Sequence, residues 1–423
     1  MKVCVIGLGY IGLPTAALLA RGGNTVIGVD KNPSVLENIR KTGGPPEEPG
    51  LRDLVLEMIR EKKLILSPEP EPCDAFILCL PTPIKEDHTP NLSYVEKGMA
   101  SIIPHVKKGD IVVLESTVPP GTTRDIVGGM LKKKGLDPEK DVYVAHAPER
   151  VLPGKILDEM VNLDRVIGGL TLEAAERARD LYTSYVKGNI FLADATTAEF
   201  VKLAENAYRD VNIAFANELA VLAEKLGIDV WHAIEIANRH PRVTIHRPGP
   251  GVGGHCIAVD PYFLIAVSEE RTRLMQTARD INNSMPDFVL KKAKKILGSL
   301  RGKKIAVLGI AYKGNVGDTR ESPSLEVIKR LKKEGVICRV HDPYVDPENS
   351  PEKLVSLEEA VENADMVIIT TDHGVFRDID PGHIGSLVAE KILFDTRHIV
   401  NGEEWAGAGW DVVYLGDGEK YAT

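Results

Sequence analysis

The chain has 423 residues, of which 43% are hydrophobic and 27% are charged, so a globular protein of two or three domains is expected. A formal net charge of -9 argues against a general nucleic-acid-binding protein, which would present a basic face, but it leaves room for a small anionic substrate. No segment reaches the ~20 apolar residues of a membrane span. The five cysteines are scattered, with neither metal-type spacing nor a disulfide pattern. We therefore expect a cytoplasmic protein with no metal, no membrane anchor and no nucleic-acid partner.

The N-terminal segment has the pattern of a dinucleotide-binding βαβ unit. The expected elements are a strand, a helix and a strand, at Lys2–Ile6, Leu13–Arg21 and Thr25–Val29. Gly7, Gly9 and Gly12 form G-x-G-x-x-G after the first strand, and Asp30 closes the second. The glycines allow a tight turn, a close approach of the pyrophosphate and helix–strand packing, while the acid accepts hydrogen bonds from the adenosine ribose. NAD is favoured over NADP, although Lys31 weakens that preference slightly.

Three further apolar runs predict buried parallel strands, at Ala75–Leu80, Ile111–Ser116 and Val142–Glu149. Each run ends in polar or proline-marked residues, which are Pro81, Thr82 and Pro83, then Glu115, Ser116 and Thr117, then Pro148 and Glu149. Ligands bind at the carboxyl ends of strands in open α/β sheets, so we expect these residues to surround the nicotinamide.

The sequence pattern becomes helical after residue 195. Thr196 with Glu199 matches a capping box and Gly227 a helix stop, so about 30 helical residues are expected, or roughly 45 Å. Such a length suits a connecting spine that also forms a dimer. Irregular structure from Asn238 to Pro261 and a second helical stretch from Tyr262 to Leu297 are expected next.

The C-terminal part repeats the opening pattern in weakened form. The segment Lys303–Pro343 parallels the first βαβ unit, with Ala311 in place of the middle glycine and Lys313 and Gly314 following. Ala364–His373 parallels the next strand. We predict two Rossmann-like, doubly wound, parallel-sheet α/β domains joined by a long helical spine, the second domain binding a different phosphate ligand. The predicted domains are 1-195 (NAD-binding), 196-298 (central, helical, dimerising) and 299-423 (binding the different phosphate ligand), with the substrate in a cleft between domains.

One cysteine lies in a glycine-rich loop rather than in an apolar run. Cys256 follows four glycines in the stretch "GPGVGGHCIAVDP", which begins at Gly249. A free thiol is only a few per cent thiolate at neutral pH, so it needs assistance from Lys202, from His255 or from N–H groups of the loop. Adjacency in sequence does not aim an imidazole at the sulfur, so a structural or substrate-facing role is expected for His255.

A nucleophilic cysteine beside an NAD fingerprint indicates a four-electron oxidation. Alcohol-to-aldehyde oxidation needs no nucleophile, whereas an aldehyde must become tetrahedral before it gives up a hydride, as a thiohemiacetal does. Lys202 and Asn206, at i and i+4 of the long helix, share a face that suits an alkoxide or oxyanion, although a solvated helix face is the alternative. Asp260 and Glu149 are the carboxylates best placed to move protons or activate water.

Eight motifs in a fixed order carry a family resemblance. They are "GLGYIGLP", "CLPTP", "ESTVPPGTT", "APERVLPG", "KLAENAYRDVNIAFANELA", "GPGVGGHCIAVDP", "AYKGNVGDTRESPS" and "FDTRHIV". On these the chain resembles the UDP-glucose/GDP-mannose dehydrogenase family along essentially its whole length. The resemblance implies that Cys256 is the thiohemiacetal nucleophile, that Lys202 and Asn206 stabilise the oxyanion, and that Asp260 assists proton or water handling. It also implies that Glu149 activates the hydrolytic water and that Thr117 positions a water or contacts the cofactor.

The resemblance further implies that the domain 299-423 is UDP-sugar-binding, and it implies two sets of ligand contacts. The NAD contacts are Gly7, Gly9, Tyr10, Ile11, Gly12, Asp30, Lys31, Pro81, Thr82, Thr117 and Arg320. The substrate contacts are Glu149, Arg150, Val151, Lys202, Asn206, Arg209, His240, Arg242, Gly253, His255, Tyr312, Lys313 and Arg397. Of these, Arg242 is expected to reach the substrate of a neighbouring subunit in a homodimer or dimer of dimers.

The substrate expectation rests on two of the motifs. "APERVLPG" and "GGHCIAVDP" resemble the branch of the family that acts on UDP-N-acetyl-D-mannosamine, whereas the glucose branch has phenylalanine at Arg150 and serine at His255. UDP-glucose and UDP-N-acetylglucosamine remain alternatives. A single-hydride β-hydroxyacid-type dehydrogenase would have no use for Cys256, and an inert nucleotide-sugar binder would have lost Cys256, Lys202 or Asn206.

Overall fold

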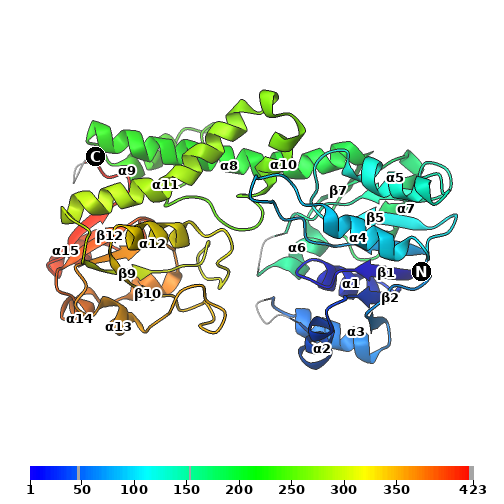
Figure 1. Cartoon of the computed structure of the whole chain (residues 1–423), viewed down its shortest axis with the longest axis horizontal. Coiled ribbons are helices and arrows are strands. Elements are labelled where there is room, and N and C mark those ends of the chain that lie inside the picture. Colours follow the sequence, from blue (N-terminus) through cyan, green and yellow to red (C-terminus); the bar gives the residue numbers. More distant parts are fainter. Residues whose placement is uncertain (45–47, 152–153, 419–423) are drawn as a thin grey trace. The chain divides into compact units, whose positions relative to one another are not determined.

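The computed structural model describes residues 1–44, 48–151 and 154–418 (Figure 1). These residues form two compact units. The N-terminal unit consists of Met1–Glu205 and Tyr262–Glu269, and the C-terminal unit contains the remaining described residues. The three-domain division expected from the sequence, and the cleft between domains, stay predictions.

The N-terminal unit is built on an eight-stranded sheet in the order β3-β2-β1-β4-β5-β6-β7-β8. Its strands are β1 (Lys2–Ile6), β2 (Thr25–Val29), β3 (Leu64–Ser67), β4 (Ala75–Leu78), β5 (Ile111–Leu114), β6 (Tyr143–His146), β7 (Arg165–Gly169) and β8 (Ile190–Asp194). Neighbouring strands are parallel except β6 and β7, which pair antiparallel with His146 opposite Gly168. The expected parallel strands are confirmed, and the chain reverses direction once within the sheet.

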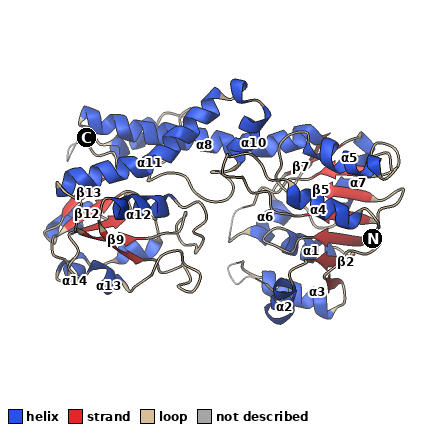
Figure 2. Cartoon of the chain, in the orientation of Figure 1, coloured by secondary structure: helices blue, strands red, loops and turns tan. Residues whose placement is uncertain are grey.

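Helices cover both faces of this sheet (Figure 2). Along β1, Val3 and Val5 belong to one hydrophobic core, while Cys4 and Ile6 belong to a second one on the opposite face. Alternation between two buried faces is what a doubly wound sheet requires, because successive side chains of a strand point to opposite sides. The helices are α1 (Gly12–Arg21), α2 (Pro33–Thr42), α3 (Leu51–Arg60), α4 (Ser93–Ile102), the π-helical η1 (Thr123–Gly128), α5 (Gly129–Lys133), α6 (Ile156–Asn162) and α7 (Leu172–Tyr182).

The expected long helix is α8 (Ala195–Leu226), which runs for 32 residues and ends before Gly227. The predicted capping box at its start is wrong. Asp194 accepts the N–H of Thr197 (3.0 Å), and the carboxylate of Glu199 accepts the backbone N–H groups of Gly121 (2.5 Å) and Thr123 (2.7 Å). Glu199 therefore fastens the segment that follows β5 to α8 instead of capping its own helix. The remaining helices of this region are α9 (Val230–Ala237), α10 (Asp260–Val267), the short η2 (Glu269–Arg271) and α11 (Arg273–Leu297).

The C-terminal unit carries a five-stranded parallel sheet in the order β10-β9-β11-β12-β13. Its elements are β9 (Lys304–Leu308), α12 (Pro323–Lys333), β10 (Ile337–His341), α13 (Leu357–Val361), β11 (Met366–Ile369), η3 (Gly374–Asp378), α14 (Pro381–Gly385), β12 (Ile392–Asp395), α15 (Gly402–Gly407) and β13 (Asp411–Tyr414). The order β10-β9-β11 repeats the order β2-β1-β4 of the other unit. The second Rossmann-like domain is therefore confirmed. Among the described residues, no helix combines the length and apolar character needed to cross a membrane.

Candidate active site

The loop between β1 and α1 contains the three glycines of the fingerprint. Gly7 has a φ of 91°, and a Cβ on it would lie 2.4 Å from the carbonyl oxygen of Cys79. A Cβ on Gly12 would lie 1.8 Å from the carbonyl oxygen of Gly7. A Cβ on Gly9, in contrast, would meet no atom within 4 Å, so the loop is open at that point. Ile11 provides no side-chain cap at the start of α1, while Leu13 donates its N–H to the carbonyl of Gly9 (3.1 Å) and Pro14 has no N–H. The loop fits a dinucleotide pyrophosphate.

Asp30 follows β2 beside this loop. Its carboxylate accepts the backbone N–H of Leu8 (3.1 Å) and that of Asn32 (2.9 Å), which fixes the acid at the edge where a ribose would lie. Tyr10 donates its hydroxyl to Glu48 (2.5 Å), and Ile11 packs against the core of the unit.

The strand ends expected around the nicotinamide are connected to one another. Thr82 donates its hydroxyl to the carbonyl of Thr117 (2.7 Å), and Ser116 accepts the N–H of Leu80 (2.8 Å). The ends of β4 and β5 are thus held together as one edge, and Pro81 is exposed on it.

Three buried charged side chains of the N-terminal unit form a cluster. Arg165, at the start of β7, pairs with Glu149 and lies 3.3 Å from Glu115. Glu115 also accepts hydrogen bonds from Thr15 (3.1 Å) and from the Cys79 thiol (2.9 Å). Glu115 therefore faces the interior of the unit, and the expectation that it contacts the nicotinamide is replaced by a structural role.

Burial governs the protonation of this cluster. It raises the pKa of Glu115, against the nearby charge of Arg165. Burial, together with the charge of Glu115, also raises the pKa of the Cys79 thiol well above its usual range. Cys79 is therefore held as a thiol and is no competitor to Cys256 as a nucleophile.

Arg150 and Val151 follow Glu149 in the chain. The Arg150 guanidinium pairs with Glu205 of α8 (2.6 Å) and donates to the carbonyl of Asp164 (3.2 Å). Val151 packs against the core of the N-terminal unit. The chain after β6 is thereby fastened to α8, close in sequence to Lys202.

The polar pair on α8 is not a solvated face. The side chain of Lys202 is buried, at 8% exposure, and within the described part of the chain its ammonium has no hydrogen-bonding or ion-pair partner. Asn206 donates its side-chain amide to the carboxylate of Asp260 (2.6 Å), the first residue of α10. A buried ammonium favours an anionic or strongly polar ligand, because it otherwise loses its hydration without compensation.

The glycines of the cysteine loop are required by close packing. A Cβ on Gly253 would lie 2.4 Å from the carbonyl oxygen of Glu321, and one on Gly254 would lie 2.7 Å from the ring of Tyr312. Gly254 has a φ of 85° and donates its N–H to the carbonyl of Arg320 (3.0 Å). The loop therefore lies directly on the backbone that precedes α12, where no side chain fits.

The start of the loop is held by a buried polar network that the sequence analysis missed. Gly249 donates its N–H to Asn217 of α8 (2.9 Å), and Asn217 donates to Asn282 of α11 (2.8 Å). Asn282 in turn donates to Asp210 (2.8 Å), which also pairs with Arg279 (2.7 Å). Two helices and the loop are thus connected through one set of hydrogen bonds.

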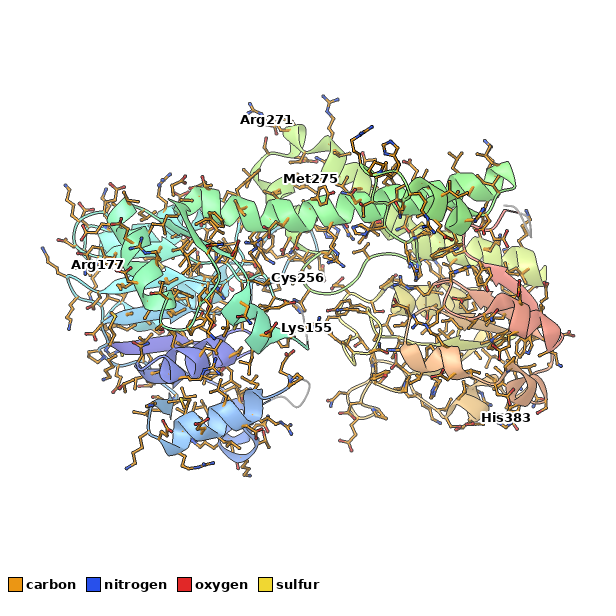
Figure 3. The ribbon with its side chains drawn as sticks, turned by 180° about the vertical axis from the view of Figure 1, so that it is seen from behind. Lys155, Arg177, Cys256, Arg271, Met275 and His383 are labelled. Atoms are coloured by element: carbon orange, nitrogen blue, oxygen red, sulfur yellow. The ribbon has the colours of Figure 1, made fainter. Side chains whose placement is uncertain are left out.

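Cys256 lies in this loop (Figure 3), and its sulfur is 3.0 Å from Nδ1 of His255. The imidazole is therefore directed at the sulfur, which adjacency in sequence alone did not establish. The carbonyl of Cys256 accepts the N–H groups of Val259 (3.0 Å) and Asp260 (2.8 Å), which hold the backbone as it enters α10.

The remaining predicted ligand contacts divide by exposure. Arg397 pairs with Asp372 (3.1 Å), and its Nη1 lies 2.4 Å from the position that a Cβ on Gly249 would take. Arg320 forms a bidentate pair with Asp318 (2.6 and 2.9 Å). The exposed members are Lys31, Arg209, His240, Arg242, Lys313 and Arg320. In the described residues no group of three or more His, Cys, Asp or Glu side chains is arranged to hold a metal ion.

Three family models match the chain in succession. They are the NAD binding domain of the UDP-glucose/GDP-mannose dehydrogenase family over residues 1–186, its central domain over 196–284 and its UDP binding domain over 306–402. The chain belongs to the UDP-glucose/GDP-mannose dehydrogenase family. It is an NAD-dependent nucleotide-sugar dehydrogenase, as the sequence analysis expected.

Named relatives cover nearly the whole chain. This chain is 48% identical to the UDP-N-acetyl-D-mannosamine dehydrogenase of Methanocaldococcus jannaschii, over 99% of its own length and 97% of that protein. The solved structure of UDP-D-ManNAc dehydrogenase from Pyrococcus horikoshii is 41% identical, with a TM-score of 0.92 over 99% of this chain and all of that one. The NDP-N-acetyl-D-galactosaminuronic acid dehydrogenase of Ralstonia solanacearum is 41% identical over 93% of this chain and 95% of that protein.

In both Rossmann-like domains of this nucleotide-sugar dehydrogenase, an aspartate after the second strand accepts backbone N–H groups of the loop after the first strand. Asp342 follows β10 as Asp30 follows β2, and it accepts the N–H groups of Ile310 (2.7 Å) and Ala311 (3.1 Å). His373 contacts the same carboxylate (3.0 Å), so the acid is fully engaged by protein groups. The additional contact with His373 distinguishes Asp342 from Asp30. It agrees with a UDP-binding rather than a second NAD-binding role for the C-terminal domain.

Proposed function

We propose that this dehydrogenase oxidises the C6 hydroxyl of a UDP-hexosamine to the carboxylate, with UDP-N-acetyl-D-mannosamine as substrate and UDP-N-acetyl-D-mannosaminuronate as product. The relatives named for that sugar, at 41–48% identity over nearly the full length, support the choice of substrate. The observation that carries the four-electron reaction is Cys256, which sits in a tightly packed glycine loop with an imidazole nitrogen 3.0 Å from its sulfur.

The proposed reaction consumes two NAD and one water for each sugar and releases three protons. The alcohol first loses a hydride from C6 and the proton of its hydroxyl group to give the aldehyde. The Cys256 thiolate then adds to the aldehyde carbon, and a second hydride leaves the tetrahedral adduct to give a thioester. Water cleaves the thioester and frees the sulfur. NAD, when bound, supplies the acceptor for both hydrides.

Other side chains are proposed to perform the remaining steps of the reaction. Lys202 and Asn206 stabilise the oxyanion of the adduct. This role is supported by the burial of Lys202 and by the lack of a hydrogen-bonding partner for its ammonium among the described residues. Asp260 accepts from Asn206 and thereby orients its amide. Glu149 activates the hydrolytic water, and its pairing with Arg165 holds the carboxylate in place. Thr117, on the adjoining strand end, positions a water or the cofactor.

The other sugars of the family are the runner-up substrates. UDP-glucose and UDP-N-acetylglucosamine are two alternatives. The relative named for N-acetyl-D-galactosaminuronic acid adds an N-acetylgalactosamine sugar as a third. A single-hydride reaction is disfavoured, since it would leave Cys256 without a use.

The test is an initial-rate screen of NAD reduction with UDP-ManNAc, UDP-GlcNAc, UDP-GalNAc, UDP-glucose and GDP-mannose. We expect UDP-ManNAc to give the highest kcat/KM, with two NADH formed per sugar. Cys256→Ser is expected to bind the sugar nucleotide yet to form acid at least ~10³-fold more slowly. Cys338→Ser, a half-buried cysteine on β10, is the matched control and keeps full activity. One NADH per sugar, or full acid formation by Cys256→Ser, contradicts the covalent route.

We also propose that two copies of the chain associate through α8. Within the C-terminal unit, Tyr208, Phe215 and Leu222 recur every seven residues and Leu226 follows one turn later, so they form one stripe along the helix. All four side chains are exposed, at 69%, 49%, 48% and 61%. A continuous apolar stripe of this kind marks a protein interface, and heptad spacing suits a second helix.

A further inference from the structure

We propose that His255 is a catalytic residue, which takes the proton of the Cys256 thiol and works with it as an imidazolium–thiolate pair. The inference deepens the proposed function, because it names the group that generates the nucleophile at that site.

The geometry of the pair is the first support. Nδ1 of His255 and Sγ of Cys256 are 3.0 Å apart, within the reach of a direct hydrogen bond. Both residues are half-buried, so the imidazole is sheltered but still has access to water for exchanging its proton.

The backbone on both sides of the pair is fixed. On the N-terminal side, Gly254 donates its N–H to the carbonyl of Arg320 (3.0 Å). On the C-terminal side, the carbonyl of Cys256 accepts the N–H of Asp260 (2.8 Å). Two adjacent side chains normally diverge, but a loop held at both ends preserves a conformation in which these two meet.

The charged groups around the pair favour its ionised form. The loop before α12 contributes Tyr312, Asp318 and Arg320, and α10 contributes Asp260. Arg320 interacts electrostatically with Cys256, and its positive charge stabilises a thiolate. Asp318 interacts with His255, and its negative charge stabilises an imidazolium.

Asp318 is ionised in the folded protein. Burial by itself would raise the pKa of Asp318, but hydrogen bonds from Arg320 outweigh burial and hold that pKa below its usual range. Tyr312 stays protonated and adds no charge, because burial and the neighbouring Asp318 raise its pKa. The Asp318–Arg320 ion pair thus presents one charge to each member of the catalytic pair.

The proton transfers balance over one turnover. The S–H bond of Cys256 breaks as an N–H bond forms at Nδ1 of His255. The thiolate then forms the C–S bond while the C=O π electrons move to oxygen, giving an alkoxide that Lys202 and Asn206 hold. This alkoxide re-forms C=O when the hydride departs, so it requires no proton. When water cleaves the thioester, the departing thiolate recovers its proton from the imidazolium.

The test is the pH dependence of Cys256 alkylation by iodoacetamide, followed by peptide mass spectrometry in the full-length protein without substrate. For the wild type we expect an alkylation midpoint below the ordinary thiol value of about 8.5. For His255→Gln we expect the midpoint to rise toward that value and the rate at pH 6.5 to fall at least ~10-fold, in proportion to the lost thiolate. His232→Gln, an exposed histidine on α9 outside the site, is the matched control and retains the wild-type profile.

A second measurement does not depend on the folding of a histidine variant. The thiolate absorbance of the wild type is titrated against that of Cys256→Ser, and the difference is expected to have a midpoint below about 8.5. Coincident alkylation profiles of wild type and His255→Gln, or a difference midpoint at or above that value, overturn the role of His255. Acid formation by Cys256→Ser overturns the covalent route instead, so the two failures are distinct.

Discussion

Gly9, in the loop after β1, and Gly12, the first residue of α1, are three residues apart, yet the fold itself requires glycine only at Gly12. At Gly12 a methyl group would meet the carbonyl oxygen of Gly7 at 1.8 Å, an atom of the backbone that cannot rotate away. At Gly9 the same methyl group would point into open space. The first requirement comes from folding, whereas the second appears only when a ligand approaches.

The two alanine substitutions should therefore separate stability from binding. We expect Gly9→Ala to keep the wild-type Tm without NAD while NAD affinity falls ~10-fold or more, because the methyl group occupies the path of the pyrophosphate. We expect Gly12→Ala to lose about 1–3 kcal/mol of unfolding free energy through overpacking. Thermal unfolding without ligand and calorimetric titration with NAD measure the two effects. Unchanged NAD affinity in Gly9→Ala would refute the assignment of the pyrophosphate to the open space beside Gly9.

At the scale of elements, the cysteine loop depends on helices far from it in sequence. Gly249 is attached to Asn217 of α8, and Asn217 to Asn282 of α11, through buried hydrogen bonds. A buried polar network stabilises when every member is satisfied and becomes costly when one member is removed. The position of Cys256 is thus sensitive to residues that touch no ligand.

Asn217→Ala tests this dependence. It leaves the N–H of Gly249 and the side-chain oxygen of Asn282 without their partner, so we expect a loss of about 1–3 kcal/mol in unfolding free energy. We also expect faster amide hydrogen exchange at Gly249. Asn212→Ala is the matched control, because Asn212 is half-buried on the same helix and donates its side-chain amide to the carbonyl of Tyr208, outside the network. Equal Tm values for the two variants would show that the network does not hold the loop.

Local patterns predicted β1, β2, β4, β5 and β6, the glycine loop and α8, because each is encoded by a contiguous run of residues, whereas β3, β7, β8, β12 and β13 were not predicted. They did not predict Arg165 or the Asp210–Asn282–Asn217 network, whose partners lie 16 to 72 residues away. A polar residue at a buried helical position looks like a break in the apolar face until its partner is known. The antiparallel pairing of β6 with β7 was also missed, since strand composition does not fix direction. The only available signal for Arg165 was a cation at the head of the apolar run "RVIGG".

At the scale of the whole molecule, the apolar stripe of α8 is the basis of the proposed dimer. The stripe consists of Tyr208, Phe215, Leu222 and Leu226. Side chains of this size remain exposed on a stable helix at a free-energy cost that a second copy would remove.

Charged substitutions on the stripe should dissociate the assembly. We expect the double variant Phe215→Glu/Leu222→Glu to elute as a species of half the wild-type mass in size-exclusion chromatography with light scattering, because a second helix would meet buried carboxylates. Val221→Glu is the control: Val221 is equally exposed but lies about 100° around the helix from Leu222. A wild-type mass for the double variant, or dissociation by Val221→Glu, would contradict the proposed interface.

The contact between Gly249 and Arg397 offers a route for protein engineering. A methyl group at position 249 would meet the tip of a flexible guanidinium, at 2.4 Å, rather than rigid backbone. The guanidinium would swing away and release Asp372, and the fold would tolerate the change. A single methyl group at position 249, where the chain itself has no side chain, would thus change the position of the Arg397 guanidinium, which lies almost 150 residues further along the chain.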